Sequence, residues 1–189
     1  FVAFEGVEGS GKTTQIGKLH ERMLADQLQV ILVREPGATA LGDYLRTWLK
    51  QNPTTPHAEL FLFCAARSQF VSEVVKPSLA DNIHVITDRY SASTIAYQGH
   101  GRSLGQELVM PVIKMSEQAV TPDLYVLMDI DPQLSLSRIA IARNQSSTKT
   151  RGNQTSQGRV DVEGQRFEGE PLAFHRRGRQ GYLGLAKAS

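Results

Sequence analysis

The chain has 189 residues, of which 40% are hydrophobic and 21% are charged. This composition is typical of one compact globular domain and excludes an intrinsically disordered protein. The net charge of +2 is too small to indicate a nucleic-acid-binding surface. No apolar stretch reaches the ~18 residues that a membrane span requires. The single cysteine, Cys64, cannot form an internal disulfide, so we expect a reducing, cytoplasmic location.

Short apolar runs predict buried strands, and segments with helical periodicity predict helices between them. The expected strands are residues 1–5, 29–33, 84–87 and 124–129, and the expected helices include residues 13–26, 41–49, 59–75, 132–143 and 171–187. Asn52 and Pro53 end the second helix, and Pro77 closes the third. Asp131 directly precedes Pro132 and is the expected cap of the helix that begins there.

Strands that alternate with helices predict an α/β fold, with a parallel sheet covered by helices on both faces as a three-layer sandwich. Right-handed crossovers bring the carboxyl ends of all strands to one edge of the sheet. Glu5, Asp88 and Asp129 stand at these ends. Because ligands bind at this edge in open α/β sheets, we expect the functional site there.

Residues 6–13 match the phosphate-loop pattern G-x-x-x-x-G-K-[ST] between a strand and a helix. Glycines let backbone N–H groups turn toward phosphate oxygens, and the helix adds its positive N-terminal end. Lys12 would contact the β- and γ-phosphates, and the Thr13 hydroxyl is a hard oxygen ligand for Mg²⁺. The predicted ATP-binding residues are Gly6, Val7, Glu8, Gly9, Ser10, Gly11, Lys12, Thr13 and Thr14.

Further motifs resemble the thymidylate kinase family, bacterial type, whose members are P-loop nucleoside monophosphate kinases. After the phosphate loop come R-E-P-G at residues 34–37, L-F-x-x-A-R at residues 62–67 and D-R-Y-x-x-S-x-x-A-Y-Q-G at residues 88–99. The resemblance extends from Phe1 to about residue 186. It implies a phosphotransferase that moves the γ-phosphoryl group of ATP, bound with Mg²⁺, to dTMP, giving dTDP and ADP as a step in dTTP biosynthesis.

An acceptor that carries a phosphate must be held near the γ-phosphate despite their repulsion, which requires fixed cations beyond Lys12. Arginine suits this task because it binds phosphate bidentately and stays charged. By resemblance, Arg67, Arg89 and Arg46 fill this role. The alternative for each is an ion pair with a surface carboxylate.

The resemblance also implies how the nucleoside is bound. Phe63 would stack on thymine while Thr94 and Gln98 read the edge of the base. Tyr97 would crowd the sugar 2′ position and so favour deoxyribose, and Glu8 would accept a hydrogen bond from the 3′-hydroxyl. Phe63 and Tyr97 could instead be ordinary core aromatics. The predicted dTMP-binding residues are Glu8, Glu35, Pro36, Arg46, Phe63, Arg67, Arg89, Thr94, Tyr97 and Gln98.

Asp88 ends a buried strand close to the phosphate loop, where a carboxylate can hold Mg²⁺ through water. With Thr13 it forms the predicted metal site. The acceptor phosphate has a second pKa near 6 and is already anionic at neutral pH, so no general base is needed. We therefore expect catalysis by positioning and charge stabilisation.

The phosphate loop has no basic residue in its interior, so in this family the transition-state cations would come from a mobile lid, here residues 143–168. The candidates are Arg143, Arg151, Arg159 and Arg166. Arg166 is preferred because residues 166–168 resemble the D-R-x-E segment of the family, although Gln165 replaces its aspartate. The predicted catalytic residues are Lys12, Arg89, Arg166 and Arg143.

Residues 144–158 are polar, lack an apolar period and are expected to form a mobile loop. Residues 1–189 are expected to form a single P-loop kinase domain that includes this lid. Family members continue with a last strand and helix, so that pair is expected to be missing here, leaving an exposed sheet edge. By resemblance the protein forms a homodimer, for which the stripe of Phe61, Phe70 and Val74 is a candidate face, or equally part of the core.

Two alternatives to the dTMP acceptor remain open. A UMP/CMP kinase or a deoxynucleoside kinase would share the phosphate loop, but the latter requires a base near the 5′-hydroxyl. A nucleotide-binding regulatory or scaffold protein would bind ATP without turnover. For the thymidylate kinase interpretation, the expected partners are dTMP and ATP, and neither nucleic acid nor a membrane is expected as a partner.

Overall fold

The computed structural model describes residues 1–149, 167 and 169–188. Four parallel strands form one sheet in the order β2-β3-β1-β4. The strands are β1 (Val2–Glu5), β2 (Val30–Arg34), β3 (His84–Asp88) and β4 (Leu124–Leu127). The sequence predicted these four strands, and the parallel α/β sheet is confirmed.

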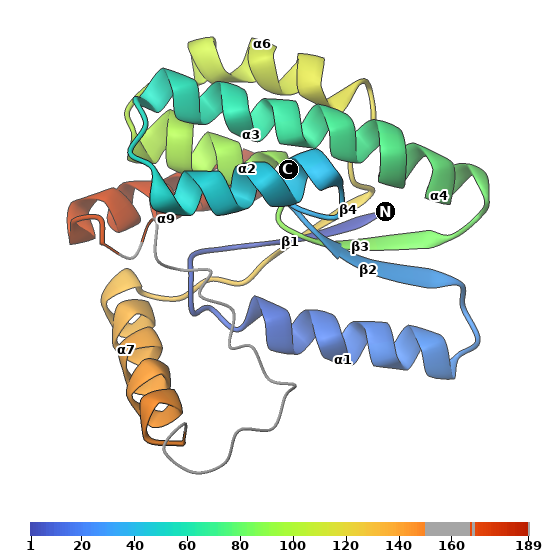
Figure 1. Ribbon diagram of the computed structural model, residues 1–189, viewed down its shortest axis with the longest axis horizontal. Coiled ribbons are helices and arrows are strands. Elements are labelled where there is room, and N and C mark those ends of the chain that lie inside the picture. Colours follow the sequence, from blue (N-terminus) through green and yellow to red (C-terminus); the bar gives the residue numbers. More distant parts are fainter. Residues whose placement is uncertain (150–166, 168, 189) are drawn as a thin grey trace.

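Helices cover both faces of the sheet (Figure 1), as expected for a three-layer sandwich. Helix α1 lies on one face, and α2, α3 and α6 lie on the other, while α7 stands beyond the carboxyl ends of the strands. The helical segments are α1 (Lys12–Ala25), α2 (Ala40–Gln51), α3 (Pro56–Phe70), η1 (Val71–Val75), α4 (Lys76–Ala80), α5 (Ser91–Thr94), η2 (Ile95–Gly101), α6 (Gln106–Glu117), α7 (Pro132–Lys149) and α9 (Leu172–Ala188).

The two faces of the sheet are packed by alternate residues of the same strand. In β1, Phe4 packs with Ile16 of α1. Its neighbour Ala3 packs with Phe70 and Val85 on the opposite face. Successive side chains of a strand point to opposite faces, so a strand that is apolar throughout needs a helix on each side. Packing on both faces holds the strands in place, and it thereby fixes the positions of the polar residues at their carboxyl ends.

The helix expected to close at Pro77 continues instead. Helix α3 runs into the π-helical segment η1 and then into α4, where Pro77 lies in the first turn. Proline has no N–H to donate and so interrupts the regular hydrogen-bond pattern of an α-helix; here the turn directly before it is π-helical, and the Lys76 N–H bonds the Val71 carbonyl. A second π-helical segment, η2, follows α5. Periodicity in the sequence did not reveal either segment.

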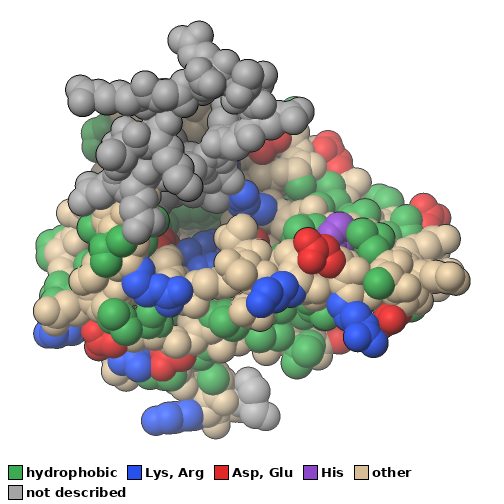
Figure 2. All heavy atoms as spheres, turned by 90° about the horizontal axis from the view of Figure 1, so that it is seen from below, with side chains coloured by type: hydrophobic (Ala, Val, Ile, Leu, Met, Phe, Trp, Pro, Cys, Tyr) green, Lys and Arg blue, Asp and Glu red, His purple; other side chains and the backbone are tan. Residues whose placement is uncertain are grey.

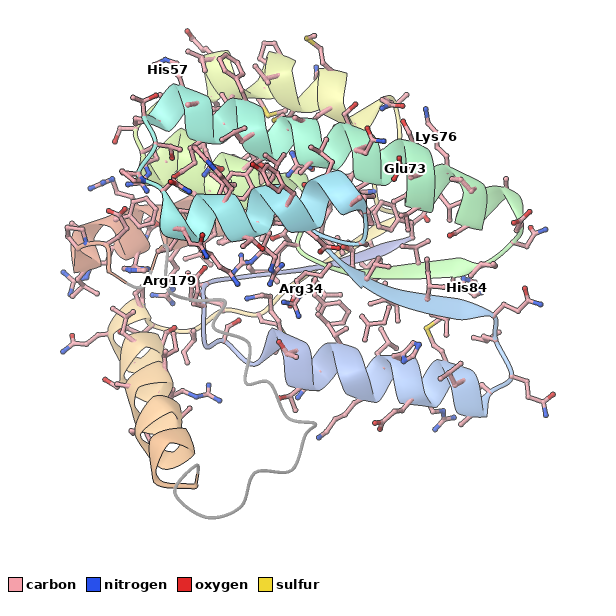
Figure 3. The ribbon with its side chains drawn as sticks, viewed as in Figure 1. Arg34, His57, Glu73, Lys76, His84 and Arg179 are labelled. Atoms are coloured by element: carbon pink, nitrogen blue, oxygen red, sulfur yellow. The ribbon has the colours of Figure 1, made fainter. Side chains whose placement is uncertain are left out.

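Helix α7 was expected to end at residue 143 but continues to Lys149, so residues 144–149 belong to a helix rather than a loop. The expected cap is confirmed, since Asp131 Oδ1 accepts the backbone N–H of Gln133 at 2.9 Å. Asp129 does not cap this helix. It forms two 2.7 Å hydrogen bonds with Arg179 of α9, which lies beside the start of α7 (Figure 3).

The surface carries charges of both signs. On the face in Figure 2, basic, acidic and apolar side chains are interspersed. Among the residues that the structure describes, no helix is long and apolar enough to cross a membrane.

Candidate active site

The carboxyl ends of the strands border one large cavity. Its volume is about 530 Å³, and its lining includes Asp88 from β3 and Arg34 from β2. Figure 3 shows Arg34 at the end of β2, between the sheet and α1 in this view. The cavity brings together residues that the sequence analysis assigned to the two substrates and to the metal: Glu8, Gly9, Gly11, Lys12, Thr13, Thr14, Glu35, Pro36, Arg46, Phe63, Arg67, Asp88, Arg89, Thr94, Tyr97 and Gln98.

The phosphate loop lies between β1 and α1. Gly6 has φ 136°, and a Cβ at this position would collide with the Met128 carbonyl, so the turn requires glycine. The Lys12 side chain folds back over the loop and donates to the Gly6 and Val7 carbonyls at 2.9 and 3.0 Å. Burial, together with the Arg89 charge, lowers the pKa of Lys12 to about 8. A buried ammonium that faces backbone oxygens is poised to exchange them for phosphate oxygens.

Gly6, Val7 and Ser10 belong to the loop but do not contribute to the described lining of the cavity. Val7 and Ser10 are buried. In this structure these three residues form part of the loop backbone behind the cavity. The loop residues that line the cavity are Glu8, Gly9, Gly11, Lys12 and Thr13.

Glu8 points from the phosphate loop toward the opposite wall. Its carboxylate accepts hydrogen bonds from the Tyr97 hydroxyl at 2.9 and 3.0 Å and from Arg89 Nη2 at 2.9 Å. Burial alone would raise the pKa of Glu8, but the Arg89 and Lys12 charges outweigh it and lower that pKa. Glu8 is thus an anion held between two cations.

Arg89 follows β3 in the left-handed region at φ 77°. Its Nη1 donates to the Gly6 carbonyl, Ser93 Oγ and the Tyr182 hydroxyl at 3.0–3.1 Å. The strained backbone is held because four acceptors, Glu8 included, fix the guanidinium. The side chain is therefore oriented before any ligand arrives.

Glu5, at the end of β1, contacts the residues around Arg89. Its Oε1 accepts a hydrogen bond from the Tyr90 backbone N–H at 2.7 Å, and its Oε2 accepts one from Ser93 Oγ at 2.6 Å. Burial raises the pKa of Glu5 despite these bonds and the nearby Arg89 charge.

Arg67 lies deeper, with only 2% of its side chain exposed, and it forms a 2.7 Å ion pair with Glu35. Its Nη2 donates to Thr94 Oγ1 at 2.8 Å. Among the described residues, Nε and Nη1 find no hydrogen-bond partner, so these donors are left to a ligand. Burial raises the pKa of Glu35 to about 7 against the opposing Arg67 charge. Arg46 donates to the Pro36 carbonyl at 2.7 Å.

The apolar wall is aromatic. Phe63 and Tyr97 both line the cavity, and Phe167 lies against both, with ring centroids 6.3 Å from Phe63 and 4.8 Å from Tyr97. The Tyr97 and Phe167 rings are nearly parallel at 8°. Phe167 follows Arg166, but the sequence analysis gave it no role because nothing local shows that it reaches the cavity.

The predicted metal ligands lie on the same cavity. Asp88 Oδ1 is buried, and among the described residues it has no hydrogen-bond partner. Thr13 also lines the cavity. Two hard oxygen donors fit a Mg²⁺ ion that takes its other ligands from water and phosphate. No group of three or more His, Cys, Asp or Glu in the described part of the chain could hold a metal by itself.

Helix α7 supplies a wall that the sequence analysis missed. Arg138, Ile139 and Ala142 line the cavity beside the phosphate loop, and Ser135 Oγ donates to the Glu8 carbonyl. The remaining lining residues without a prior assignment are Arg34, Leu49, Lys50, Tyr90 and Ser93. Arg151, Arg159, Arg166 and the side chain of Arg143 lie outside the described residues.

A phosphate loop on a parallel sheet, facing an arginine-lined pocket across one cavity, defines a P-loop kinase of small nucleotides. The family model described as thymidylate kinase matches residues 4–189. Two of the relatives that match all of this chain are the thymidylate kinase of Solidesulfovibrio magneticus, 44% identical with 86% of that protein covered, and that of Pelobacter propionicus, 41% identical with 81% covered. The crystal structure of thymidylate kinase from Ehrlichia chaffeensis is also similar, with a TM-score of 0.74 and 30% identity over all of this chain and 84% of that one. The chain belongs to the thymidylate kinase family.

Proposed function

We propose that the protein transfers the γ-phosphoryl group of ATP to dTMP, giving dTDP and ADP. The observation that carries this proposal is the shared cavity, in which the phosphate loop and the pocket of Arg67, Arg89 and Tyr97 face one another. Membership of the thymidylate kinase family supports the same reaction.

ATP binds at the phosphate loop, with Lys12 on the β- and γ-phosphates and the N-terminus of α1 behind them. Thr13 and Asp88 would hold Mg²⁺, directly or through water. The ion would screen the charge of the phosphates during transfer. Because Asp88 Oδ1 is already buried and unpartnered within the described chain, it needs no rearrangement to serve the ion's water shell.

dTMP binds across the cavity. Its phosphate lies near Arg89, with Arg46 further along the wall, and its sugar lies beside Glu8 and Tyr97. The Tyr97 hydroxyl is fixed by Glu8, so the ring closes the space that a 2′-hydroxyl would need. The base is held by Phe63, Thr94 and Gln98. Arg67, which the sequence analysis assigned to the acceptor phosphate, is buried and paired with Glu35, and we propose instead that its unpartnered Nε and Nη1 serve the deep end of the pocket. Glu35 and Pro36 complete this wall through their contacts with Arg67 and Arg46.

Catalysis follows from position and charge. The acceptor oxygen is anionic at neutral pH, so no side chain has to remove a proton. Arg89 and Lys12 hold the two substrates in line and offset their mutual repulsion. Arg166 and Arg143 are the proposed lid cations.

We further propose a cytoplasmic homodimer. Phe70 is wholly buried and belongs to the core, which removes it from the expected dimer stripe. Phe61 on α3 and Met115 on α6 are 56% and 78% exposed, and these two helices pack against one another. Large exposed apolar side chains on two adjacent helices support self-association through this side of the molecule.

The test is ADP release by the purified protein with Mg-ATP and each of dTMP, dUMP, UMP, CMP and thymidine. We expect a strong preference for dTMP and its loss in Lys12→Met. Turnover with thymidine would contradict the phosphate-acceptor pocket. ATP binding without turnover of any acceptor would favour a regulatory or scaffold protein.

A further inference from the structure

The Gln98 side chain is buried in the wall of the acceptor pocket and is held by a residue behind it. It lines the cavity, yet it is only 2% exposed. Its Nε2 donates to Glu59 Oε1 at 2.7 Å, across 39 residues of sequence. Glu59 lies in the first turn of α3, is fully buried, and stands behind Gln98 rather than in the described lining of the cavity.

The charge of Glu59 is balanced by Arg102. Nε and Nη2 of Arg102 donate to the two carboxylate oxygens at 3.2 and 3.1 Å, which is a bidentate contact. The other terminal nitrogen, Nη1, pairs with Glu170 at 2.7 Å. Arg102 also lies 4.8 Å from the centroid of the Phe174 ring. The bidentate contact with Arg102, rather than Glu170, holds the Glu59 carboxylate against Gln98.

An ionised carboxylate can only accept hydrogen bonds, so the amide of Gln98 must turn its NH₂ group toward Glu59. Flipping the amide would place two oxygens in contact and leave the buried carboxylate without that donor. The carbonyl Oε1 is then turned away from Glu59 and can accept a hydrogen bond from a ligand. Glu59 thereby makes this position of the pocket a hydrogen-bond acceptor.

Thr94 has its polarity fixed in the opposite sense. Its Oγ1 accepts a hydrogen bond from the Arg67 guanidinium at 2.8 Å, so its own proton is free to be donated. Arg67 is in turn held by Glu35 at 2.7 Å. The ion pairs Arg102–Glu59 and Arg67–Glu35 thus set one acceptor and one donor on the wall of the pocket.

We propose that Glu59 is a positioning residue that selects the base through Gln98. A base with an imide N3–H, such as thymine or uracil, can donate to the Gln98 carbonyl, whereas cytosine presents a lone pair at N3 and is repelled. This inference rests on the proposed function for the identity of the ligand. It adds a residue outside the cavity that decides between pyrimidines.

The discriminating pair of ligands is dTMP and 5-methyl-dCMP, which share the methyl group, the sugar and the phosphate and differ at N3 and at position 4. Binding is measured by calorimetry with the full chain, and the KM for each nucleotide is measured with Mg-ATP. We expect the wild type to prefer dTMP by about 100-fold or more, because a mismatched base leaves buried groups unpaired. Glu59→Gln lets the amide flip, and we expect the preference to fall about tenfold.

Two further variants separate positioning from general stability. Glu170→Gln removes the other carboxylate on Arg102 without touching Gln98, and we expect it to leave the preference unchanged. In a Gln98→Leu background, Glu59→Gln should cause no further loss of preference, because its effect passes through Gln98. A well-folded Glu59→Gln protein with the wild-type preference, or with equal losses for both nucleotides, would overturn the proposal.

Melting temperatures report whether each variant folds. If Glu59→Gln does not fold, Glu59→Asp is judged by the same criterion, since it keeps the charge but withdraws it from Gln98. The wild type's turnover of dTMP tests the proposed function separately. If turnover is absent but dTMP binds, the ratio of dissociation constants still decides the role of Glu59. Binding of neither nucleotide by the wild type would overturn both proposals.

Discussion

The hydroxyl of Tyr182, in the last helix, accepts a hydrogen bond from Arg89 Nη1 at 3.1 Å, although 93 residues separate the two in sequence. The same hydroxyl lies 2.8 Å from Ser93 Oγ and 3.3 Å from Glu5 Oε2. Burial raises the pKa of Tyr182 further above its ordinary value, so the phenol stays protonated at every working pH. Helix α9 thus helps to hold Arg89, the arginine that we propose for the acceptor phosphate.

Tyr182→Phe should therefore loosen Arg89 without removing packing. Because the hydrogen bond from the Arg89 guanidinium is lost, together with the contacts to Ser93 and Glu5, we expect kcat/KM for dTMP to fall about tenfold. Tyr125→Phe is the matched control, since its hydroxyl bonds Ser91 at 2.7 Å outside the cavity lining. Steady-state kinetics of both variants would decide, and an equal loss in the two would show that α9 acts on stability alone.

Glu35 should make stability depend on pH. Its pKa in the folded protein is raised to about 7, so between about pH 4.5 and pH 7 the folded state holds a proton that the unfolded chain has lost. The contribution of Glu35 to stability is therefore present at low pH and declines as pH rises toward 7.

The measurement is urea unfolding of wild type and Glu35→Gln from pH 5 to pH 8. The difference in unfolding free energy between the two proteins should change by up to about 3 kcal/mol over this range. A difference that stays constant with pH would mean that Arg67 keeps Glu35 ionised throughout.

Lys12 should limit ATP capture at high pH. The pKa of its ammonium is lowered to about 8 in the protein without nucleotide, and only the charged form attracts phosphate. Since kcat/KM reports the free enzyme, we expect kcat/KM for ATP to fall about tenfold per pH unit above that pKa. The Tyr97 pKa is raised well above 10 by burial and by Glu8, so this hydroxyl does not titrate in that range. A profile that stays flat to pH 9.5 would contradict the low Lys12 pKa.

Arg138 is expected to serve the donor side of the cavity. It projects from α7 into the lining next to Ile139 and the phosphate loop. Arg138→Ala should raise the KM for ATP about tenfold while leaving that for dTMP within about twofold, because the lost charge lies on one substrate's side. Arg22→Ala removes an arginine whose side chain is 77% exposed and serves as control. A larger effect on dTMP would place Arg138 in the acceptor half.

Local patterns predicted the strands, the phosphate loop and the Asp131 cap because each depends on residues close together in the chain. Contacts between distant segments left no such signal. Nothing near Tyr182 or Arg138 shows that their helices return to the strand ends, and nothing near Glu59 shows that it meets Gln98. The sequence predicts a helix end at Pro77 because proline does not fit the regular hydrogen-bond pattern of an α-helix. The sequence does not show that the turn before Pro77 is π-helical and that the helix therefore continues. The motif resemblance named residues that the structure gathers around one cavity, but it did not name the charged residues behind them, such as Glu59 and Arg102.

Glu8 belongs to both halves of the cavity. Its backbone is part of the phosphate loop, and its carbonyl accepts a hydrogen bond from the Ser135 hydroxyl. Its carboxylate accepts hydrogen bonds from Arg89 and from the Tyr97 hydroxyl. A ligand that shifts either end moves the other, so the two substrates are expected to change each other's affinity. Thermodynamic reciprocity requires that the factor by which dTMP alters the affinity for ATP equals the factor by which ATP alters that for dTMP. The shared residue Glu8 would thus give the same coupling constant whether ATP or dTMP binds first, and the order of binding would depend only on the association rates of the two substrates.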